Sequence, residues 1–207
     1  MSADNHPWEI IYRKDGRVFP EPFPRFPEVV ELFIEYGCNE ILDLGCGSGR
    51  HCVHLAKEKF KVTGLDISST GLGLTQEWLR AEGLESRIVQ SDFRHPLPFR
   101  DGSFSGVFST QVIHHARIDA VRLAIREIHR LLSSSGVAYI SVAARKDDGE
   151  FMEVEPGTFV PQTGSEAGLP HHIFSEEALR AEFHAFTVID ISLRAKGKVR
   201  VLTAQKT

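Results

Sequence analysis

The chain has 207 residues, of which 42% are hydrophobic and 25% charged, a composition typical of one folded domain with a full apolar core. Its net charge of −4, from 24 basic and 28 acidic residues, gives no positive field that would attract nucleic acid or an anionic membrane surface. The sequence has no apolar run near the ~18 residues of a membrane helix and no secretory leader. We therefore expect a single cytoplasmic domain over residues 1–207, with no nucleic-acid or membrane partner.

The N-terminal residues 1–26 are crowded with prolines in their second half, which disfavours a helix or a central strand. We predict an irregular segment that ends where Pro27 opens the first helix. Trp8, Tyr12 and Phe19 could fold over a bound ligand as a lid, or form a small cluster that holds this segment in place.

Residues 41–51, with the sequence ILDLGCGSGRH, predict a buried strand, a glycine turn and the start of a helix. Gly45, Gly47 and Gly49 stand at alternate positions, where missing Cβ atoms let backbone amides approach a ligand. The following helix would direct its N-terminal N–H groups at the same ligand. This unit is typical of a site for a nucleotide-like ligand.

Acids close three consecutive predicted strands. Asp43 ends the first strand, and Asp66 ends the second, KVTGLD, about twenty residues after the first glycine, where a carboxylate can reach two ribose hydroxyls. Asp92 closes the third, RIVQSD, where it could accept a hydrogen bond from an adenine amino group. We expect all three acids to face the ligand.

The order of the motifs distinguishes between nucleotide sites. The glycines follow G-x-G-x-G, not the dinucleotide form G-x-G-x-x-G, and the segment DLGCGSG resembles the first motif of class I methyltransferases that depend on S-adenosylmethionine (SAM). GLDIS at 64–68 looks like their ribose-binding acid. Residues 91–115 are similar to the third and fourth strands of the small-molecule branch, and residues 127–142 to the helix, glycine turn and fifth strand that follow. The resemblance covers about residues 29–142.

This resemblance implies a single Rossmann-like α/β domain with a mostly parallel seven-stranded sheet, helices on both faces and a C-terminal antiparallel hairpin. It implies SAM as cofactor and S-adenosylhomocysteine as product. The cofactor-binding residues that it implies are Asp43, Gly45, Cys46, Gly47, Gly49, Arg50, Asp66, Ile67, Asp92, Phe93 and Gln111.

Residues 145–174 break the alternation of strands and helices with charges, glycines and prolines, which predicts a long substrate-side loop. The late segment is similar to a subgroup that includes relatives of the bacterial tellurite-resistance methyltransferases. The substrate-binding residues that this implies are Tyr12, His115, Glu155, Thr158, His171 and His172. The resemblance stops before the C-terminus, so it leaves the acceptor open, with tellurite or another metalloid oxyanion as one candidate.

Histidines are numerous, with 10 in the chain. His114 and His115 follow the fourth strand, where an open α/β sheet has its ligand crevice, and His171 and His172 lie in the late segment. Adjacent residues of an extended chain point in opposite directions, and no acid or thiol is spaced with these pairs, so we predict no metal site. His115 and His171 are the candidate catalytic bases. The alternative is that both have a purely structural role.

The sequence also excludes some acceptors. STQVIHH follows the fourth strand, where methyltransferases of base amino groups and glutamine amides carry D/N-P-P-Y/F, and the paired glutamates of arginine methyltransferases are missing. Cys38, Cys46 and Cys52 are expected to be reduced thiols and not a trap for arsenite. We predict an enzyme that transfers the methyl group of SAM to a small molecule by in-line displacement. The alternatives are a catalytically silent SAM-binding module and, less favoured, a nicotinamide-dependent oxidoreductase.

Overall fold

The computed structural model describes residues 3–146 and 148–207; the predicted N-terminal and substrate-side segments also include residues 1, 2 and 147, which lie outside the described residues. The helices are η1 (Ala3–Asn5), α1 (Pro7–Asp15), α2 (Phe26–Glu35), α3 (Arg50–Lys57), α4 (Ser69–Ala81), α5 (Ile118–Leu131), α6 (Glu176–Glu182) and η2 (Ala195–Gly197). The strands are β1 (Glu40–Leu44), β2 (Lys61–Asp66), β3 (Arg87–Gln90), β4 (Phe104–Thr110), β5 (Leu132–Ala143), β6 (Phe151–Glu155), β7 (Thr158–Pro161), β8 (His171–His172), β9 (Phe186–Arg194) and β10 (Val199–Lys206).

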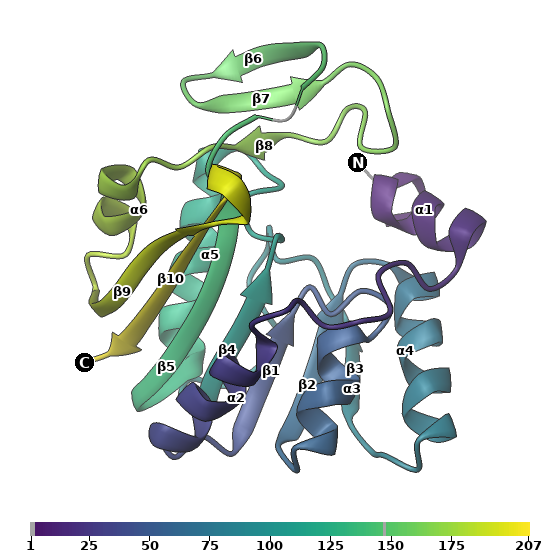
Figure 1. Ribbon diagram of the computed structural model, residues 1–207, viewed down its shortest axis with the longest axis vertical. Helices are drawn as coiled ribbons and strands as arrows, with labels where there is room; N and C mark the ends of the chain where they lie inside the picture. Colours follow the sequence, from purple (N-terminus) through teal and green to yellow (C-terminus); the bar gives the residue numbers. More distant parts are fainter. Residues whose placement is uncertain (1–2, 147) are drawn as a thin grey trace.

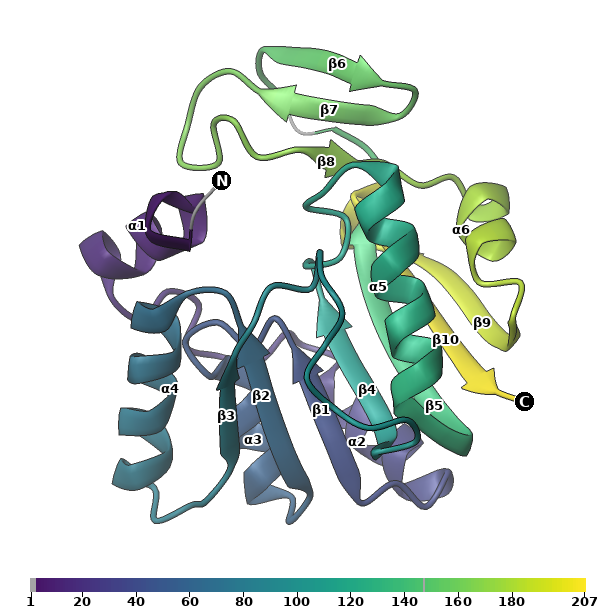
Figure 2. The same cartoon turned by 180° about the vertical axis from the view of Figure 1, so that it is seen from behind.

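Within these described residues the strands form a large sheet of seven, in the order β3-β2-β1-β4-β5-β10-β9, and a small sheet of three, β6-β7-β8. The strands β1 to β5 pair in parallel, whereas β10 runs antiparallel to both β5 and β9. Helices cover both faces of the large sheet (Figures 1 and 2). The prediction of a Rossmann-like sheet with a C-terminal antiparallel hairpin is confirmed.

The sheet buries its two faces against different helices. On one face α5 presents Val121, Ile125 and Ile128, which recur three or four residues apart and therefore share one side of the helix. On the other face α2 contributes Val29 and Phe33 to a second cluster, both fully buried. Full burial of a side chain of this size contributes about 1.5 to 3 kcal/mol to stability. The sheet is thus held rigid, and its strand ends are fixed in space.

The N-terminal segment differs from the prediction, because residues 7–15 form α1. Pro7 occupies the first turn, where its missing N–H costs no helical hydrogen bond, and the His6 side chain accepts from the backbone N–H of Trp8. Gly16 ends the helix with a positive φ of 66°. The crowded prolines that predicted irregular structure come only after this point.

The second difference is that much of the predicted loop 145–174 is folded as the small sheet, drawn above the large sheet in Figures 1 and 2. The hairpin β6–β7 turns at Gly157, which has a φ of 78°, and β8 pairs with β7 through Phe159 and His171. These strands have five, four and two residues, too short for a pattern of alternating side chains to predict them.

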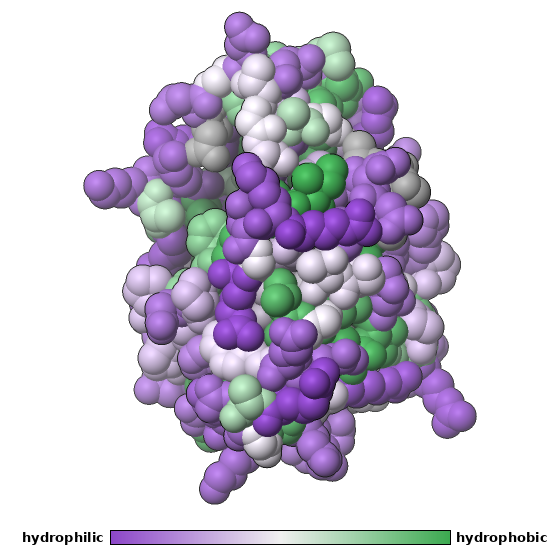
Figure 3. Space-filling model, turned by 90° about the vertical axis from the view of Figure 1, so that its right-hand side faces the viewer, coloured by the Kyte–Doolittle hydropathy of each residue, from purple (hydrophilic) through white to green (hydrophobic). Residues whose placement is uncertain are grey.

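Hydrophilic residues cover most of the face that carries α1 and α4, with smaller hydrophobic areas between them (Figure 3). The large hydrophobic side chains that remain exposed are spread over several elements: Ile10, Phe19, Ile34, Met152, Ile189 and Leu193. Among the described helices none has both the length and the apolar character needed to cross a membrane.

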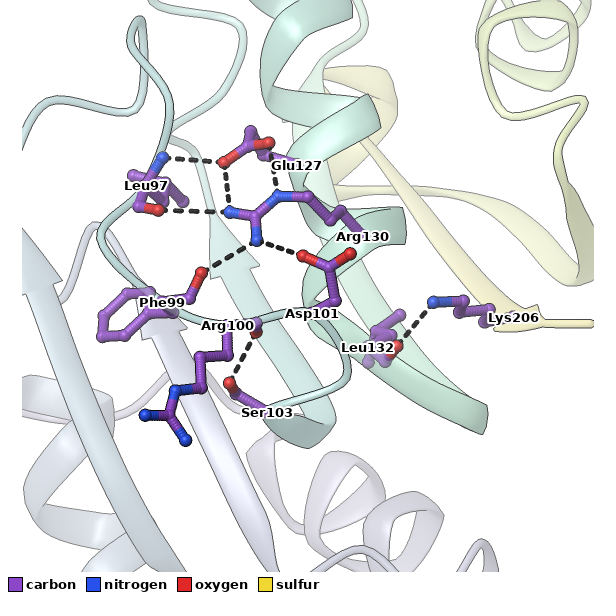
Figure 4. Close-up of polar contacts among 9 residues, drawn as sticks. All are labelled: Leu97, Phe99, Arg100, Asp101, Ser103, Glu127, Arg130, Leu132 and Lys206. Atoms are coloured by element: carbon purple, nitrogen blue, oxygen red, sulfur yellow. Dashed lines mark hydrogen bonds and ion pairs between the residues drawn. The ribbon is translucent and has the colours of Figure 1, made fainter.

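A guanidinium group joins α5 to the loop that precedes β4 (Figure 4). Arg130 donates to the carbonyl oxygens of Leu97 at 3.1 Å and Phe99 at 2.8 Å, and it pairs with Glu127 and Asp101 at 2.7 Å each. Glu127 in turn accepts from the Leu97 N–H at 2.7 Å. These contacts fix where β4 begins, and β4 carries the residues that enter the site described below.

We predict that Arg130→Ala lowers the free energy of unfolding by about 2 to 4 kcal/mol, because it leaves the buried Glu127 carboxylate and two carbonyl groups without their partner. Urea unfolding measures this change. Arg126→Ala, at an exposed position one turn earlier on the same helix, is the control and should change stability by less than about 0.5 kcal/mol. Equal losses in the two variants would contradict the role given to Arg130.

Candidate cofactor and substrate site

A cavity of about 450 Å³ lies at the carboxyl ends of the parallel strands. The strand order reverses between β1 and β4, and a crevice at such a reversal is the usual ligand site of an open α/β sheet. The glycine turn after β1 forms its floor, and α1 and the small sheet lie on either side. This volume is in the range of small-molecule pockets.

The glycine turn needs all three of its glycines. Gly45, Gly47 and Gly49 have φ values of 81°, 55° and 94°, in the left-handed region that side chains other than glycine rarely adopt. A Cβ at Gly47 would lie 2.2 Å from the Tyr12 hydroxyl oxygen, and one at Gly45 would lie 2.2 Å from a methyl carbon of Val112. The turn is therefore closed on both sides by neighbouring side chains.

Asp66 holds this turn at the end of β2. Its carboxylate accepts from the N–H groups of Gly47 and Ser68, each at 2.8 Å, so it links the turn after β1 to the start of α4. Burial raises its pKa above the usual range, while these backbone donors oppose the increase. Asp66 lines the cavity, as do the predicted cofactor residues Gly45, Cys46, Gly47, Arg50, Ile67, Asp92, Phe93 and Gln111.

Asp43 and Gly49 are the two predicted cofactor residues that do not line the cavity. Asp43 is 2% exposed beneath the turn, and its Oδ2 atom has no hydrogen-bond partner among the described residues. Burial, followed by the neighbouring Asp66, raises its pKa to about 7, and Arg50 only partly offsets this. Asp43 therefore lies outside the cavity, and its contact with the cofactor stays a prediction.

Asp92 lines the cavity but already has a partner in Arg94. The Arg94 side chain lies 2.9 Å from Oδ1 and 2.7 Å from Oδ2, so the guanidinium group contacts both carboxylate oxygens. Arg94 also lines the cavity. No motif in the sequence indicated this residue, because Arg-Asp pairs two residues apart are common on surfaces. The predicted contact from Asp92 to an adenine amino group would have to use its remaining lone pairs.

Helix α1 covers the glycine turn and is anchored by a buried acid. Glu9 is 1% exposed and accepts from the Thr70 hydroxyl at 2.6 Å, the Thr70 N–H at 3.1 Å and the Ser68 hydroxyl. Tyr12 packs on Gly47, and Trp8 stacks on His115 with ring centroids 6.3 Å apart. Trp8, Tyr12 and Phe19 all line the cavity, and their movement as a lid stays a prediction.

Three histidines meet on the wall opposite the glycine turn. His114 and His115 follow β4 in a turn closed by the His115 N–H donating to the Val112 carbonyl at 2.9 Å, and His171 comes from β8. The ring centroids of His114 and His115 are 4.2 Å apart, and those of His115 and His171 are 4.7 Å apart. The argument that adjacent histidines point in opposite directions was wrong here, because the chain is turned and not extended at this point.

The other predicted substrate residues serve a different purpose. Glu155 accepts from the Ile118 N–H at 2.7 Å and from the Thr158 hydroxyl at 2.8 Å, and the same hydroxyl lies 2.7 Å from Nδ1 of His172. This network ties the small sheet to the first turn of α5. Glu155, Thr158 and His172 do not line the cavity, whereas Tyr12, His115 and His171 do.

Sequence reasoning missed Glu166, which lines the cavity beside the histidines. Its carboxylate oxygens lie 3.9 Å from Nε2 of His115 and 3.6 Å from Nε2 of His171. Glu166 is five residues before His171 in the sequence, and that proximity was the one available signal. The fold of the intervening residues decides which way its side chain points.

Comparison with known proteins places this site in a family. The family described as methyltransferase domain matches residues 41–136, which include the glycine turn, Asp66 and the His114–His115 pair. Residues 41–136, a little under half of the chain, are therefore similar to this family of methyltransferase domains. It is 34% identical over 106 residues to the uncharacterized methyltransferase YodH of Bacillus subtilis, covering 51% of this chain and 44% of that relative. It is also 34% identical over 110 residues to ajmaline N-methyltransferase of Rauvolfia serpentina, covering 52% and 37%. The chain thus spans less than half the length of these two relatives.

Solved structures share the fold of this chain. A SAM-dependent methyltransferase from Methanosarcina mazei aligns with a TM-score of 0.73 at 21% identity, over 90% of this chain and 98% of that one. TehB from Haemophilus influenzae aligns with a TM-score of 0.68 at 19% identity, over 97% and 67%. The 1,6-didemethyltoxoflavin-N1-methyltransferase of Burkholderia thailandensis, solved with S-adenosylhomocysteine, aligns with a TM-score of 0.71 at 24% identity, over 96% and 84%.

We predict that Asp43 makes a contribution to stability that falls as pH rises from about 4 to about 7. Its pKa of about 7 in the folded protein lies above the ~3.9 of an unfolded chain. Protonated Asp43 therefore favours the folded state, and this stabilisation is lost as pH rises through the window between the two pKa values. Three pKa units correspond to at most about 4 kcal/mol. Asp43→Asn should therefore raise the free energy of unfolding above that of the wild type at pH 8, and this difference should shrink toward pH 4, as urea unfolding between pH 4 and 8 would measure.

Asp15→Asn, at an exposed position, is the matched control and should leave the pH dependence of unfolding as in the wild type. A lower stability of Asp43→Asn than of the wild type at pH 8 would contradict the account of Asp43 as an uncompensated buried acid.

We predict that Glu9→Ala releases α1 from the rest of the domain, because Thr70 and Ser68 lose their common acceptor. Hydrogen exchange measured by mass spectrometry should then be at least tenfold faster for the amides of residues 7–15. Glu21→Ala, exposed in the same N-terminal segment, should exchange as the wild type does. Equal protection of α1 in Glu9→Ala and in the wild type would show that Tyr12 and Trp8 hold the helix by themselves.

Proposed function

We propose that the chain binds SAM in the cavity and transfers its methyl group by in-line displacement to a small-molecule acceptor, releasing S-adenosylhomocysteine. The observation that carries this proposal is the Asp66 carboxylate, fixed by two backbone N–H groups beside the glycine turn at the strand reversal. A carboxylate in that place suits a ribose, and the turn beside it suits the groups attached to the ribose.

We assign the cofactor contacts as follows. Asp66 accepts hydrogen bonds from the ribose hydroxyls, and the amides of the glycine turn face the amino-acid part. Ile67 and Phe93, which line the cavity at the ends of β2 and β3, flank the adenine. Gln111 stands at the end of β4 with a φ of 57° and donates through its N–H to the Ser141 carbonyl at 3.0 Å. A residue held in this rarely adopted conformation fits a binding role.

The chain's own contribution to the reaction is positioning and exclusion of water. SAM supplies an already activated methyl group on its sulfonium when bound. The roof formed by α1 and the small sheet shields the cavity, and holding the two reactants in line contributes about 7 to 11 kcal/mol in favourable cases. His115 and His171 face the acceptor side. Burial keeps the pKa of His115 well below its usual value, so its ring is neutral at pH 7 and suits accepting a hydrogen bond better than storing a proton.

A small-molecule acceptor is favoured over nucleic acid. One relative, 30% identical over 104 residues, is the ribosomal RNA small subunit methyltransferase C of Alcanivorax borkumensis, which this chain covers over 31% of its length. The net charge of −4 and the STQVIHH segment argue against an RNA substrate here. Two other similar proteins are named for methylation at nitrogen, so nitrogen nucleophiles and metalloid oxyanions are the first acceptors to test. The three cysteines, all buried as free thiols, fit a cytoplasmic location.

Calorimetry and turnover together test this function. We expect micromolar or tighter binding of SAM and S-adenosylhomocysteine, no binding of NAD, and methyl transfer from labelled SAM to at least one small amine, thiol, phenol or metalloid oxyanion. Asp66→Ala should weaken SAM binding by a factor of about 10 to 100, because charge-assisted hydrogen bonds are worth about 1.5 to 3 kcal/mol each. Asp15→Ala is the control.

Three outcomes discriminate between the alternatives. Binding of NAD in place of SAM would favour the oxidoreductase. Binding of SAM without turnover on any acceptor would favour the silent binding module. Unchanged SAM affinity in folded Asp66→Ala would contradict the ribose assignment.

A further inference from the structure

The histidine cluster brings three ligand atoms together. One nitrogen from each of His114, His115 and His171 lies within 4.8 Å of the other two. His114 is 2% exposed and His115 is 8% exposed, and the His171 side chain is 16% exposed. The three rings therefore converge at the inner wall of the cavity and not on the protein surface.

This arrangement is unfavourable unless something binds there. Nδ1 of His114 is buried with no hydrogen-bond partner among the described residues. Leaving a buried polar atom without a partner costs about 1 to 3 kcal/mol. A neutral imidazole with an unused lone pair is the form in which histidine binds a metal.

The backbone holds the cluster in place from two directions. The His172 N–H donates to the His114 carbonyl at 2.8 Å, which joins β8 to the turn after β4. The Leu169 N–H donates to the Glu166 carbonyl at 3.0 Å, which forms a turn in the chain before β8. The Glu166 carboxylate then lies 3.6 Å from His171 and 3.9 Å from His115, adding an anionic oxygen to three nitrogens.

The donor set and its dimensions fit one class of ion. Zn–N bonds of about 2.0 to 2.1 Å place ligand nitrogens roughly 3.4 Å apart in a tetrahedral site. The present separations are at most 4.8 Å, so the rings must rotate or move inward to reach that value. Three imidazoles and a carboxylate suit Zn²⁺, Co²⁺ or Ni²⁺, whereas Mg²⁺ and Ca²⁺ prefer sites made of oxygen atoms alone.

We propose that His114, His115 and His171 bind a divalent transition metal ion, Zn²⁺ in preference, with Glu166 as the fourth ligand. The expectation of no metal site rested on extended chain geometry, which the turn after β4 replaces. The ion stands in the same cavity as the proposed cofactor residues, on the acceptor side.

The metal also points to a class of acceptor, a step that rests on the proposed function. A small molecule with an oxygen, nitrogen or sulfur donor would displace Glu166 or add to the ion, lose its proton to solvent and be held as an anion. Its lone pair then forms the bond to the methyl carbon as the carbon–sulfur bond of the sulfonium breaks. This removes the need for a histidine base in the cluster.

Metal binding is tested without any substrate. The full chain is stripped with a chelator and titrated with Co²⁺, followed by visible absorption, and with Zn²⁺, followed by calorimetry. We expect one equivalent of either ion and the visible bands of a tetrahedral Co²⁺ site. His114→Ala and His171→Gln should each weaken binding at least 100-fold, and Glu166→Gln about tenfold. His184→Ala, exposed beyond α6, is the control.

Thermal unfolding guards against variants that fail to fold. Zn²⁺ should raise the melting temperature of the wild type and of His184→Ala, because it binds only the folded state, and should not raise that of His171→Gln. No stoichiometric binding to the stripped protein, or equal affinity in His171→Gln and the wild type, overturns the site.

The role of the ion is separated from the proposed function by measuring SAM affinity in the same samples. We expect removal of the metal to lower turnover at least tenfold, with recovery on adding Zn²⁺ and with unchanged SAM affinity. If metal binds but SAM does not, the proposed function fails and the metal site stands. If turnover is the same with and without metal, the acceptor role of the ion is overturned.

Discussion

Two hydrogen bonds to one carboxylate hold the site together. Asp66 accepts from the Gly47 and Ser68 N–H groups and so joins the turns after β1 and β2. The turn can approach the acid because Gly47 has no Cβ, and the same absence makes room for the Tyr12 hydroxyl. The Ser68 hydroxyl in turn donates to the Glu9 carboxylate, which anchors α1. The floor and roof of the cavity both depend on the position of this carboxylate.

The other half of the cavity depends on contacts between segments far apart in the chain. Glu155 ties the small sheet to the N-terminus of α5, and His172 ties β8 to the turn after β4. These contacts do not touch the cavity, but they decide that His171 faces His114 and His115. Residues that position the site are thus largely distinct from those that line it.

The sequence predicted the features that depend on local patterns. A short apolar strand, alternate glycines and an acid at each strand end are readable along the chain, and they led correctly to the sheet, the turn and the place of Asp66 at the end of β2. Helix α1 was missed because crowded prolines outweighed a short helix that Glu9 stabilises through contacts some sixty residues away. The small sheet and the histidine cluster were missed for the same reason. The small sheet depends on the pairing of β7 with β8, and the histidine cluster depends on the turn at Val112. Neither contact produces a periodic pattern in the sequence. Glu155, Thr158 and His172 were placed at the substrate because segment resemblance does not say which way a side chain points.

The most direct test of this account is a crystal structure of the chain with S-adenosylhomocysteine. We expect the ribose hydroxyls within hydrogen-bond distance of the Asp66 carboxylate, the amino-acid part along the glycine turn, and the thioether sulfur facing the cluster of His114, His115 and His171. A ligand bound elsewhere, or a ribose that leaves Asp66 bonded to the backbone alone, would contradict it.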